Sequence, residues 1–539
     1  MHRFLKLVLL LLSLLASQPD QRFRAFDWVT YRDPGSISSI SEGYIYTYFA
    51  SSNGGIYRFH NNGNFFDHPI SMAQGLKSQT IHAVHFDKNT GILWAGLPEI
   101  IQYTYTREGQ WNQISFSDLG LSSQDRINAI GSSPDYLWVK AKVIYLKLDR
   151  SSGILLGQYP FPDEGNIQWS SEYKDIIKPS ENLWINYSVM SNWMWTGQYF
   201  IDPYGRNVDI TTFYLGKNND IWLGGSDGTL FLGDHNMEVL FPYAIGPLSS
   251  NFSTISKFED EIWLAGPNRF NTSGVTRMFF KTLEFDHYES DITINMYPMN
   301  INDILNLGDN IFFAGDDGLQ LYDKDDDYWR FLGAERGIPI GKINTLAKDN
   351  SHLWLGGING LARLNLKKYR NEPSGIEDIF DFQNIQKLFL THGDLWIATW
   401  NNLYIFDTEN PELKTFKDKG YFTLGGPFTG FNEIVFNDGY LYIASNQGIL
   451  SFDYDTENWT KIIDANVYAG KTIESMAISG KYCFLGFRNK FIRIDILDKY
   501  QKEYDFPFLG TVKDLYISGQ YIYLATTEGL TKFKWTVDR

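Results

Sequence analysis

The sequence contains a single cysteine, Cys483, among 539 residues. One cysteine cannot form an internal disulfide bond, and it excludes every zinc site that needs several cysteine ligands. The sequence also lacks the HExxH and P-loop patterns of zinc proteases and nucleotide-binding proteins. We therefore expect no cofactor, and no residue can be given a catalytic role from the sequence.

Basic residues are also scarce relative to acidic ones. Lys and Arg number 47 against 63 Asp and Glu, which gives a formal net charge of −16. Binding to nucleic acid or to an anionic membrane surface requires a basic face. After the first residues, no apolar run is long enough to span a bilayer. The composition therefore argues against a nucleic-acid partner and against stable membrane insertion.

Residues 1–18 have the pattern of a signal peptide. His2, Arg3 and Lys6 precede a leucine-rich run of about ten residues, which is too short to cross a bilayer comfortably. We predict that the protein is periplasmic or secreted and that the mature chain begins near Ser17. N-terminal sequencing of the exported protein would test this, and an intact Met1 on cytoplasmic protein would contradict it.

The feature that the sequence has in abundance is one repeated unit, of which 353–361, LWLGGINGL, is a clear copy. An apolar run containing an aromatic anchor is followed by a turn and a second apolar run. The anchors recur every 38 to 49 residues. This period is typical of β-propeller blades, each a four-stranded antiparallel sheet. The twelve anchors are Tyr48, Trp94, Trp138, Trp184, Trp222, Trp263, Phe312, Trp354, Trp396, Tyr442, Phe484 and Tyr523.

Two further regularities support the repeat. A glycine often stands six residues after the anchor, as at Gly54 and Gly360, and Asn402 once takes this place. A tight hairpin turn there needs positive φ, which glycine adopts freely and asparagine tolerates. A second tryptophan follows some anchors after 17 residues, which indicates an outermost strand. These are Trp111, Trp329 and Trp459.

The same 17-residue step predicts how the last blade is completed. From Tyr523 it falls at position 540, just past Arg539, whereas Trp28 has the local pattern of an outermost strand. We predict that residues 26–32 pair with the strand around 530–535, so that both ends of the chain share one ring and no open edge remains. Residues 22–539 would form about twelve blades, most simply two propellers in tandem. Splits of six and six, seven and five, or five and seven are equally compatible with the sequence.

Three stretches carry a more specific pattern, at 73–96, 118–139 and 335–365. Each has a Gly-Leu or similar turn, a strand, an acidic turn and then an LW-type run. This pattern resembles the two-component regulator propeller repeat, and the resemblance extends blade by blade over most of residues 26–535. It implies a periplasmic sensor-type β-propeller, often two in succession within hybrid sensor kinases. The present sequence carries no downstream kinase part.

Two groups of residues are candidate sites. Trp193, Trp195 and Tyr199 fall at even spacing and would share one face of a strand. They either cover a blade edge or a contact between propellers, or form a stacking platform for a sugar. The second group is a D-x-D-x-D run whose oxygens suit calcium, although a solvated acidic turn explains it equally. It consists of Asp323, Asp325 and Asp327.

From these observations we predict an exported, non-enzymatic propeller scaffold that presents a binding surface for a glycan, peptide or protein partner. The family resemblance adds a sensor-like role. Two alternatives stay open. One is a propeller enzyme, such as a polysaccharide lyase or a glycosidase, because fold does not decide function. The other is a structural subunit of a cell-envelope assembly.

Overall fold

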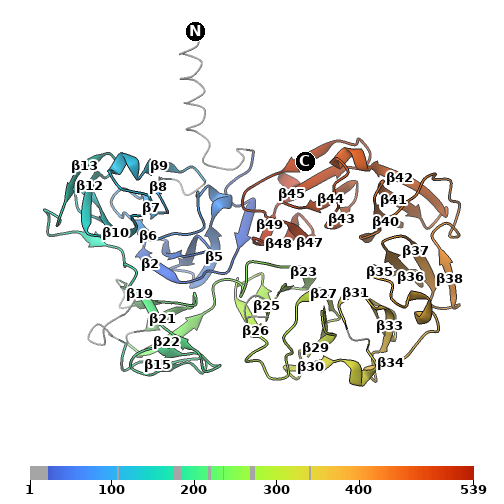
Figure 1. Ribbon diagram of the computed structural model, residues 1–539. Helices are drawn as coiled ribbons and strands as arrows, with labels where there is room; N and C mark the ends of the chain where they lie inside the picture. The colour runs from blue at the N-terminus through green and yellow to red at the C-terminus, as the bar shows by residue number, and fades with distance from the viewer. Residues whose placement is uncertain are drawn as a thin grey trace, which may run out of the picture. The chain divides into compact units, whose positions relative to one another are not determined.

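The computed structural model describes residues 22–105, 109–174, 184–216, 220–234, 236–267, 274–338 and 341–538. Within these ranges the protein is built from β-strands and short 3-10 turns (Figure 1). It is an all-β protein with the propeller fold that the repeat predicts. None of the described helices is both long enough and apolar enough to cross a membrane. The predicted signal peptide, residues 1–18, lies outside the described residues.

The chain divides into two compact units. The first contains residues 22–249, 278–286 and 532–538, and the second contains residues 250–277 and 287–531. In each unit the sheets are arranged around a centre (Figure 1). Most sheets are antiparallel meanders whose four strands follow one another in sequence from the innermost to the outermost.

The first unit holds four sheets of four or five strands and one smaller sheet among its described residues. The large sheets are β2 (Ile37–Glu42), β3 (Tyr46–Ser51), β4 (Ile56–His60) and β5 (Phe65–Ile70); β6 (Ala83–Phe86), β7 (Leu93–Gly96), β8 (Ile100–Thr104) and β9 (Asn112–Ser115); β10 (Ile127–Ser132), β11 (Tyr136–Ala141), β12 (Ile144–Asp149) and β13 (Leu155–Tyr159), with β14 (Gln168–Trp169) beside β10; and β19 (Ile210–Leu215), β20 (Asp220–Gly225), β21 (Leu230–Asp234) and β22 (Val239–Tyr243), with β15 (Ser188–Val189) beside β22. The small sheet is β16 (Met194–Trp195), β17 (Phe200–Ile201) and β18 (Asn207–Val208).

The other seven sheets have their innermost strands in the second unit. They are β23 (Thr254–Phe258), β24 (Glu261–Ala265), β25 (Gly274–Phe279) and β26 (Phe285–Glu289); β27 (Ile301–Asn306), β28 (Asn310–Gly315), β29 (Leu319–Asp323) and β30 (Tyr328–Leu332); β31 (Ile343–Lys348), β32 (His352–Gly357), β33 (Gly360–Asn365) and β34 (Arg370–Asn371); β35 (Ile385–Thr391), β36 (Asp394–Thr399), β37 (Leu403–Asp407) and β38 (Glu412–Thr415); β39 (Ile434–Asn437), β40 (Tyr440–Ser445), β41 (Gly448–Asp453) and β42 (Asn458–Asp464); β43 (Ser475–Ser479), β44 (Tyr482–Phe487), β45 (Lys490–Asp495) and β46 (Gln501–Tyr504); and β47 (Val512–Ser518), β48 (Tyr521–Thr526) and β49 (Gly529–Phe533).

The innermost strands of the second unit form a closed ring. β23, β27, β31, β35, β39, β43 and β47 contact one another in this order, and β47 contacts β23. In the first unit, β10, β6, β2 and β19 are neighbours in the same way. There the segment after β14 completes the centre, because the backbone N–H groups of Ser170, Ser171 and Lys174 donate to Ile130 in β10, Ile40 in β2 and Thr211 in β19.

The aromatic anchors hold the core of these sheets, as predicted. All twelve are buried, and eleven lie on the second strand of a sheet. The exception is Trp184, which lies in a turn, so a four-stranded blade built on it was a wrong expectation. Trp184 is buried among Phe200, Phe231 and neighbouring side chains. Trp184 is therefore buried like an anchor, although it does not lie on a strand.

The turn glycines follow the prediction at most positions. Gly360 has a φ of 105°, and Gly228, Gly318, Gly448 and Gly529 also have positive φ. In the first repeat it is Gly55 and not Gly54 that adopts it, and Asn402 does not adopt it at all. The Thr399 hydroxyl closes that turn instead, because it accepts the N–H of Asn402 at 3.1 Å and donates to the Asn402 carbonyl at 2.9 Å.

The outer-strand tryptophans and the closing strand are confirmed. Trp329 lies on β30 and Trp459 on β42, while Trp111 directly precedes β9. β1 (Trp28–Tyr31) is the fourth strand of the last sheet, in the order β1-β49-β48-β47. The Trp28 ring stacks on Phe533, with 3.7 Å between ring centroids. The N-terminal strand therefore completes the last blade.

Candidate functional site

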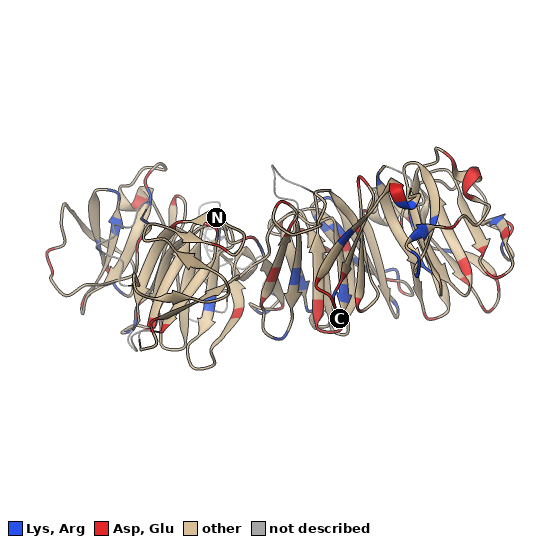
Figure 2. Cartoon of the chain, turned by 90° about the horizontal axis from the view of Figure 1, so that it is seen from below, with Lys and Arg blue, Asp and Glu red and all other residues tan. Residues whose placement is uncertain are grey.

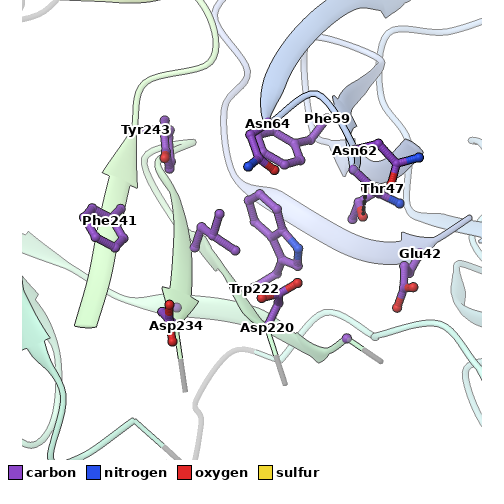
Figure 3. A pocket seen from close by; sticks show the side chains of 14 residues that line it. Glu42, Thr47, Phe59, Asn62, Asn64, Asp220, Trp222, Asp234, Phe241 and Tyr243 are labelled. Carbon is purple, nitrogen blue, oxygen red and sulfur yellow. Dashed lines mark hydrogen bonds between the residues drawn. The ribbon is translucent and has the colours of Figure 1, made fainter. Parts of the chain in front are cut away.

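A pocket of about 350 Å³ opens in the first unit between the sheets β2–β5 and β19–β22. Its lining comes from the ends of hairpins: β2–β3 and β4–β5 on one side, and β19–β20 and β21–β22 on the other (Figure 3). Because hairpin ends make no ladder hydrogen bonds to further strands, their side chains can vary without disturbing the sheets. We call this cavity the rim pocket.

One wall of the rim pocket is aromatic. Trp222, the anchor of β20, makes edge contacts with Phe59, 4.9 Å between ring centroids, and with Phe49, 4.8 Å. Tyr243 also lines the pocket and packs on Phe66 at 5.4 Å. Figure 3 shows Phe59 beside Trp222, and Asp220 close to the Trp222 ring. Because Trp222 and Phe59 are buried, Tyr243 is a ring of this apolar wall that a partner group can reach.

Three carboxylates line the same cavity: Glu42, Asp220 and Asp234. Asp220 and Asp234 are directly opposite each other in the β20–β21 pair. Like charges in this arrangement are destabilising. Burial, together with Asp234 and then Glu42, raises the pKa of Asp220 above its ordinary value. Negative charge is thus concentrated on this side of the pocket.

The equivalent acidic pair of another sheet has a cation beside it. Asp394 and Asp407 face each other in the β36–β37 pair, but the Lys419 ammonium lies 2.7 Å from Asp394. In the rim pocket, Lys88 lies 3.5 Å from Glu42. Within the part of the chain that the structure describes, no Lys or Arg forms an ion pair with Asp220, whose charged neighbours are both acidic. Lys and Arg are otherwise interspersed with Asp and Glu (Figure 2).

The β4–β5 turn adds amide groups to the pocket. Asn61 is fixed, because its side-chain oxygen accepts from the Thr47 hydroxyl at 2.8 Å and its nitrogen donates to the Gly43 carbonyl at 3.3 Å. Asn62 and Asn64 are exposed at the opening. The pocket therefore combines an aromatic wall, an acidic side and an amide-bearing rim. This set suits a group that is positively charged and rich in N–H donors.

The structure places the predicted aromatic residues elsewhere in the first unit. Trp193 packs edge-on against Phe231 at 5.0 Å, and Trp195 lies on Phe200 at 4.7 Å. Both are partly buried against the cluster around Trp184. Tyr199 lies beyond the turn that follows β16, and its carbonyl accepts from the Thr196 hydroxyl. A stacking role for these residues stays a prediction.

The predicted calcium run forms the turn between β29 and β30. The Asp323 carboxylate accepts the backbone N–H groups of Asp325 and Asp326, at 3.2 and 3.4 Å. Asp327 accepts from the Tyr322 hydroxyl at 2.8 Å. These carboxylates thus support the turn itself. Among the described residues, no group of three His, Cys, Asp or Glu side chains is arranged to hold a metal ion.

Comparison with known proteins places the chain by its fold. The LVIVD repeat family matches residues 509–531, and no curated protein sequence matches the chain. PorZ, a surface component of the type-IX secretion system of Porphyromonas gingivalis, is similar in structure, with 12% identity and a TM-score of 0.55 over 94% of this chain and 87% of PorZ. The two proteins therefore share a fold.

Extracellular domains of two B. thetaiotaomicron proteins are also similar in structure. For the one-component system proposed as BT4673 the identity is 15% and the TM-score 0.44, over 92% of this chain and 69% of that domain. For the extracellular domain of the putative hybrid two-component system BT3049 the identity is 14% and the TM-score is 0.41, over 91% of this chain and 73% of that domain.

Proposed function

We propose that the protein is an exported, non-enzymatic propeller that binds a peptide or protein partner, and that the partner inserts a basic side chain into the rim pocket. The observation that carries this is the pair Asp220–Asp234, two opposed carboxylates beside Trp222 that form no ion pair with a Lys or Arg among the residues that the structure describes. A Lys or Arg side chain would supply the missing charge, and its apolar stem or guanidinium face would cover the aromatic wall.

The proposed location outside the cytoplasm is in keeping with the fold. The fold is shared with PorZ, a surface component of a secretion system. The signal-peptide pattern of residues 1–18 supports export independently. A sensor-like role would use the same pocket, because binding of a partner segment is the event that such a protein would report.

Binding can be tested with three blocked pentapeptides that differ only in a central Lys, Arg or Gln, measured by isothermal titration calorimetry. We expect the Lys and Arg peptides to bind at least tenfold more tightly than the Gln peptide, since about 1.4 kcal/mol corresponds to tenfold and one desolvated ion pair exceeds this. Raising the salt concentration should reduce the difference. Equal binding of all three peptides would contradict the proposal.

Variants locate the effect. The double substitution Asp220→Asn with Asp234→Asn should abolish the preference for Lys and Arg. The matched control is Asp407→Asn, which alters the equivalent β36–β37 pair where Lys419 already lies beside Asp394, and it should leave the preference unchanged. Neutral chitotetraose, tested in parallel, distinguishes a glycan site. Tight binding of this sugar without binding of the peptides would contradict the proposal that the pocket binds a basic side chain.

The opposed carboxylates also predict an unusual stability effect. Asp220→Asn should stabilise the unliganded protein by about 0.5–1 kcal/mol, because it removes a like-charge pair directly opposite across two strands. Residues kept for binding often reduce stability in this way. Thermal unfolding without peptide would measure it. A destabilised Asp220→Asn protein would mean that the carboxylate has a structural partner and not a binding role.

A second candidate function follows from the same residues. A carboxyl group with a raised pKa near a second carboxylate is the arrangement of glycoside hydrolases. In that case chitotetraose or another oligosaccharide would be cleaved, and Asp220→Asn would abolish the cleavage. Binding without new products over a panel of oligosaccharides favours the non-enzymatic function.

A further inference from the structure

A second cavity, of about 450 Å³, lies in the first unit between the sheets β10–β13 and β19–β22. These sheets carry the anchors Trp138 and Trp222, and a four-stranded blade on Trp184 was expected between them. Phe213 of β19 lines this cavity, whereas Trp222, which lines the rim pocket, stands opposite Tyr214 and so faces the other side of that sheet. We call the second cavity the gap pocket.

The floor of the gap pocket is the segment 169–174, which is tied to the strands on both sides. The N–H groups of Ser170 and Lys174 donate to carbonyls of β10 and β19, at 3.0 and 2.7 Å. Trp169 is paired with Gly131, where a Cβ atom would come within 2.8 Å of the Trp169 ring. The glycine thus lets the ring pack on β10, and the segment holds Trp169 and Glu172 in fixed places.

Aromatic rings form much of the lining. Tyr145 of β12 lies edge-on to Trp169, with 5.9 Å between ring centroids. Phe213 approaches from the opposite sheet, and the Lys174 ammonium lies 5.0 Å from the centre of its ring. The three rings are only partly buried, so a ligand can reach them. A cavity of this size with several rings suits a small molecule that has an apolar part.

An ion pair stands beside these rings. The Lys140 ammonium of β11 lies 2.7 Å from the Glu172 Oε2 atom, and the two side chains are 28% and 32% exposed. Within the described part of the chain, Lys140 makes this one hydrogen bond and Glu172 Oε1 accepts none. An ammonium has three N–H groups and a carboxylate has two accepting oxygens. Both members of the pair therefore keep hydrogen-bonding capacity for a ligand.

The closeness of the two charges selects the kind of ligand. A group that reaches the Lys140 ammonium also lies near the Glu172 carboxylate, because these two are in contact. An anion alone would be repelled by Glu172, and a cation alone by Lys140. A ligand that carries both charges on one carbon can place each beside its opposite. Its hydrogen bonds are then charge-assisted on both sides, which makes them stronger than those of a neutral molecule.

We propose that the gap pocket binds a small zwitterion, an α-amino acid with an aromatic or large apolar side chain. Lys140 binds its carboxylate, Glu172 binds its ammonium, and its side chain packs on the rings of Trp169 and Tyr145. This site does not rest on the rim pocket, because the two cavities lie on opposite sides of the β19–β22 sheet. The peptides used for the rim pocket have blocked termini, so the two tests can fail separately.

Isothermal titration calorimetry of the whole protein at about pH 6, where amino and carboxyl termini are both ionised, tests the site. The probes are L-phenylalanine, N-acetyl-L-phenylalanine, which has only the carboxylate, and L-phenylalaninamide, which has only the ammonium. L-Alanine has both charges and no ring. We expect L-phenylalanine to bind at least about tenfold more tightly than each of the other three.

Two substitutions should change the order of the probes in opposite directions. Lys140→Met leaves Glu172 alone, so L-phenylalaninamide should then bind more tightly than L-phenylalanine. Glu172→Gln removes the repulsion of anions, so N-acetyl-L-phenylalanine should bind at least as tightly as L-phenylalanine. The matched control is Lys513→Met, which removes a similarly exposed ion pair with Glu474 in the second unit and should leave the order unchanged.

Three results would overturn the proposal. The first is equal binding of N-acetyl-L-phenylalanine and L-phenylalanine to the unaltered protein, which would indicate a site for anions. The second is tighter binding of D-glucose, tested in parallel, than of L-phenylalanine. The third is the absence of binding of every amino acid probe. Thermal unfolding verifies that both variants are folded, and if one is not, the other variant and the probe series still decide the question.

Discussion

Removing residues 22–33 should destabilise the last sheet by about 3–5 kcal/mol, the cost of losing a large buried side chain. Trp28, 3% exposed, would no longer cover Phe533, and β49 would become an open edge. Backbone bonds are lost as well, since Lys534 donates its N–H to the Asp27 carbonyl at 2.8 Å. The destabilised strands would lie some 500 residues away in sequence from the deletion.

Hydrogen exchange on a chain beginning at Pro34 measures this effect. Peptides covering 529–538 should lose protection, whereas peptides covering β40 and β41 serve as the control and should keep theirs. The single substitution Trp28→Ala removes the ring but retains the strand, so it should show a smaller loss in the same peptides. Unchanged protection at 529–538 in both proteins would show that β1 does not hold this edge.

The repeat made most of this fold predictable from the sequence. The anchors identify the second strands because a large apolar side chain at a fixed period must be buried against the next sheet. The 17-residue step identified Trp28 as an outer-strand residue. The anchor period was misleading at Trp184, whose side chain is buried although its backbone forms a turn. A burial pattern alone does not distinguish a strand from a turn packed against a strand.

The rim pocket could not be predicted in the same way. Glu42, Asp220 and Asn64 come from segments far apart in the sequence, and only the packing of two sheets brings them together. An opposed pair of aspartates is also not distinctive by itself, because Asp394 and Asp407 form one too. The difference lies in Lys419, and a sequence does not show which lysine reaches which carboxylate.

A set of polar residues on or beside the innermost strands of the second unit, in contrast, left a signal in the sequence besides the anchors. In the second unit a buried Ile, Phe or Val recurs eleven residues before each anchor, and a polar residue stands two places after it, as in Ile301 and Asp303 or Ile385 and Lys387. Aligning the repeats at this position would have shown one lysine among carboxylates and hydroxyls. Its ion pair with Glu433 still requires the structure.

Arg150→Met should be among the most destabilising single substitutions in the first unit. The Arg150 guanidinium binds the Asp87 carboxylate with two bonds, at 2.6 and 2.5 Å, and also donates to the Pro134 carbonyl. The Asp87 side chain has no exposed surface. Because the substitution leaves this carboxylate buried without its cation, we expect a loss of about 3–5 kcal/mol at pH 7.

The pH dependence of that loss identifies its cause. Burial would raise the pKa of Asp87, but hydrogen bonds from Arg150, Thr90 and the Asn89 N–H outweigh it and hold the pKa below its ordinary value. Asp87 therefore contributes stability above about pH 4, and this contribution is lost as the pH falls further. The stability difference between Arg150→Met and the unaltered protein, measured by hydrogen exchange of β6 and β7, should shrink from pH 7 to pH 3.

Lys368→Met, which removes an exposed pair with Glu372, is the control and should cost under about 0.5 kcal/mol. If the loss of stability from Arg150→Met is equal at both pH values, packing of the arginine, and not its charge, joins the sheets β6–β9 and β10–β13.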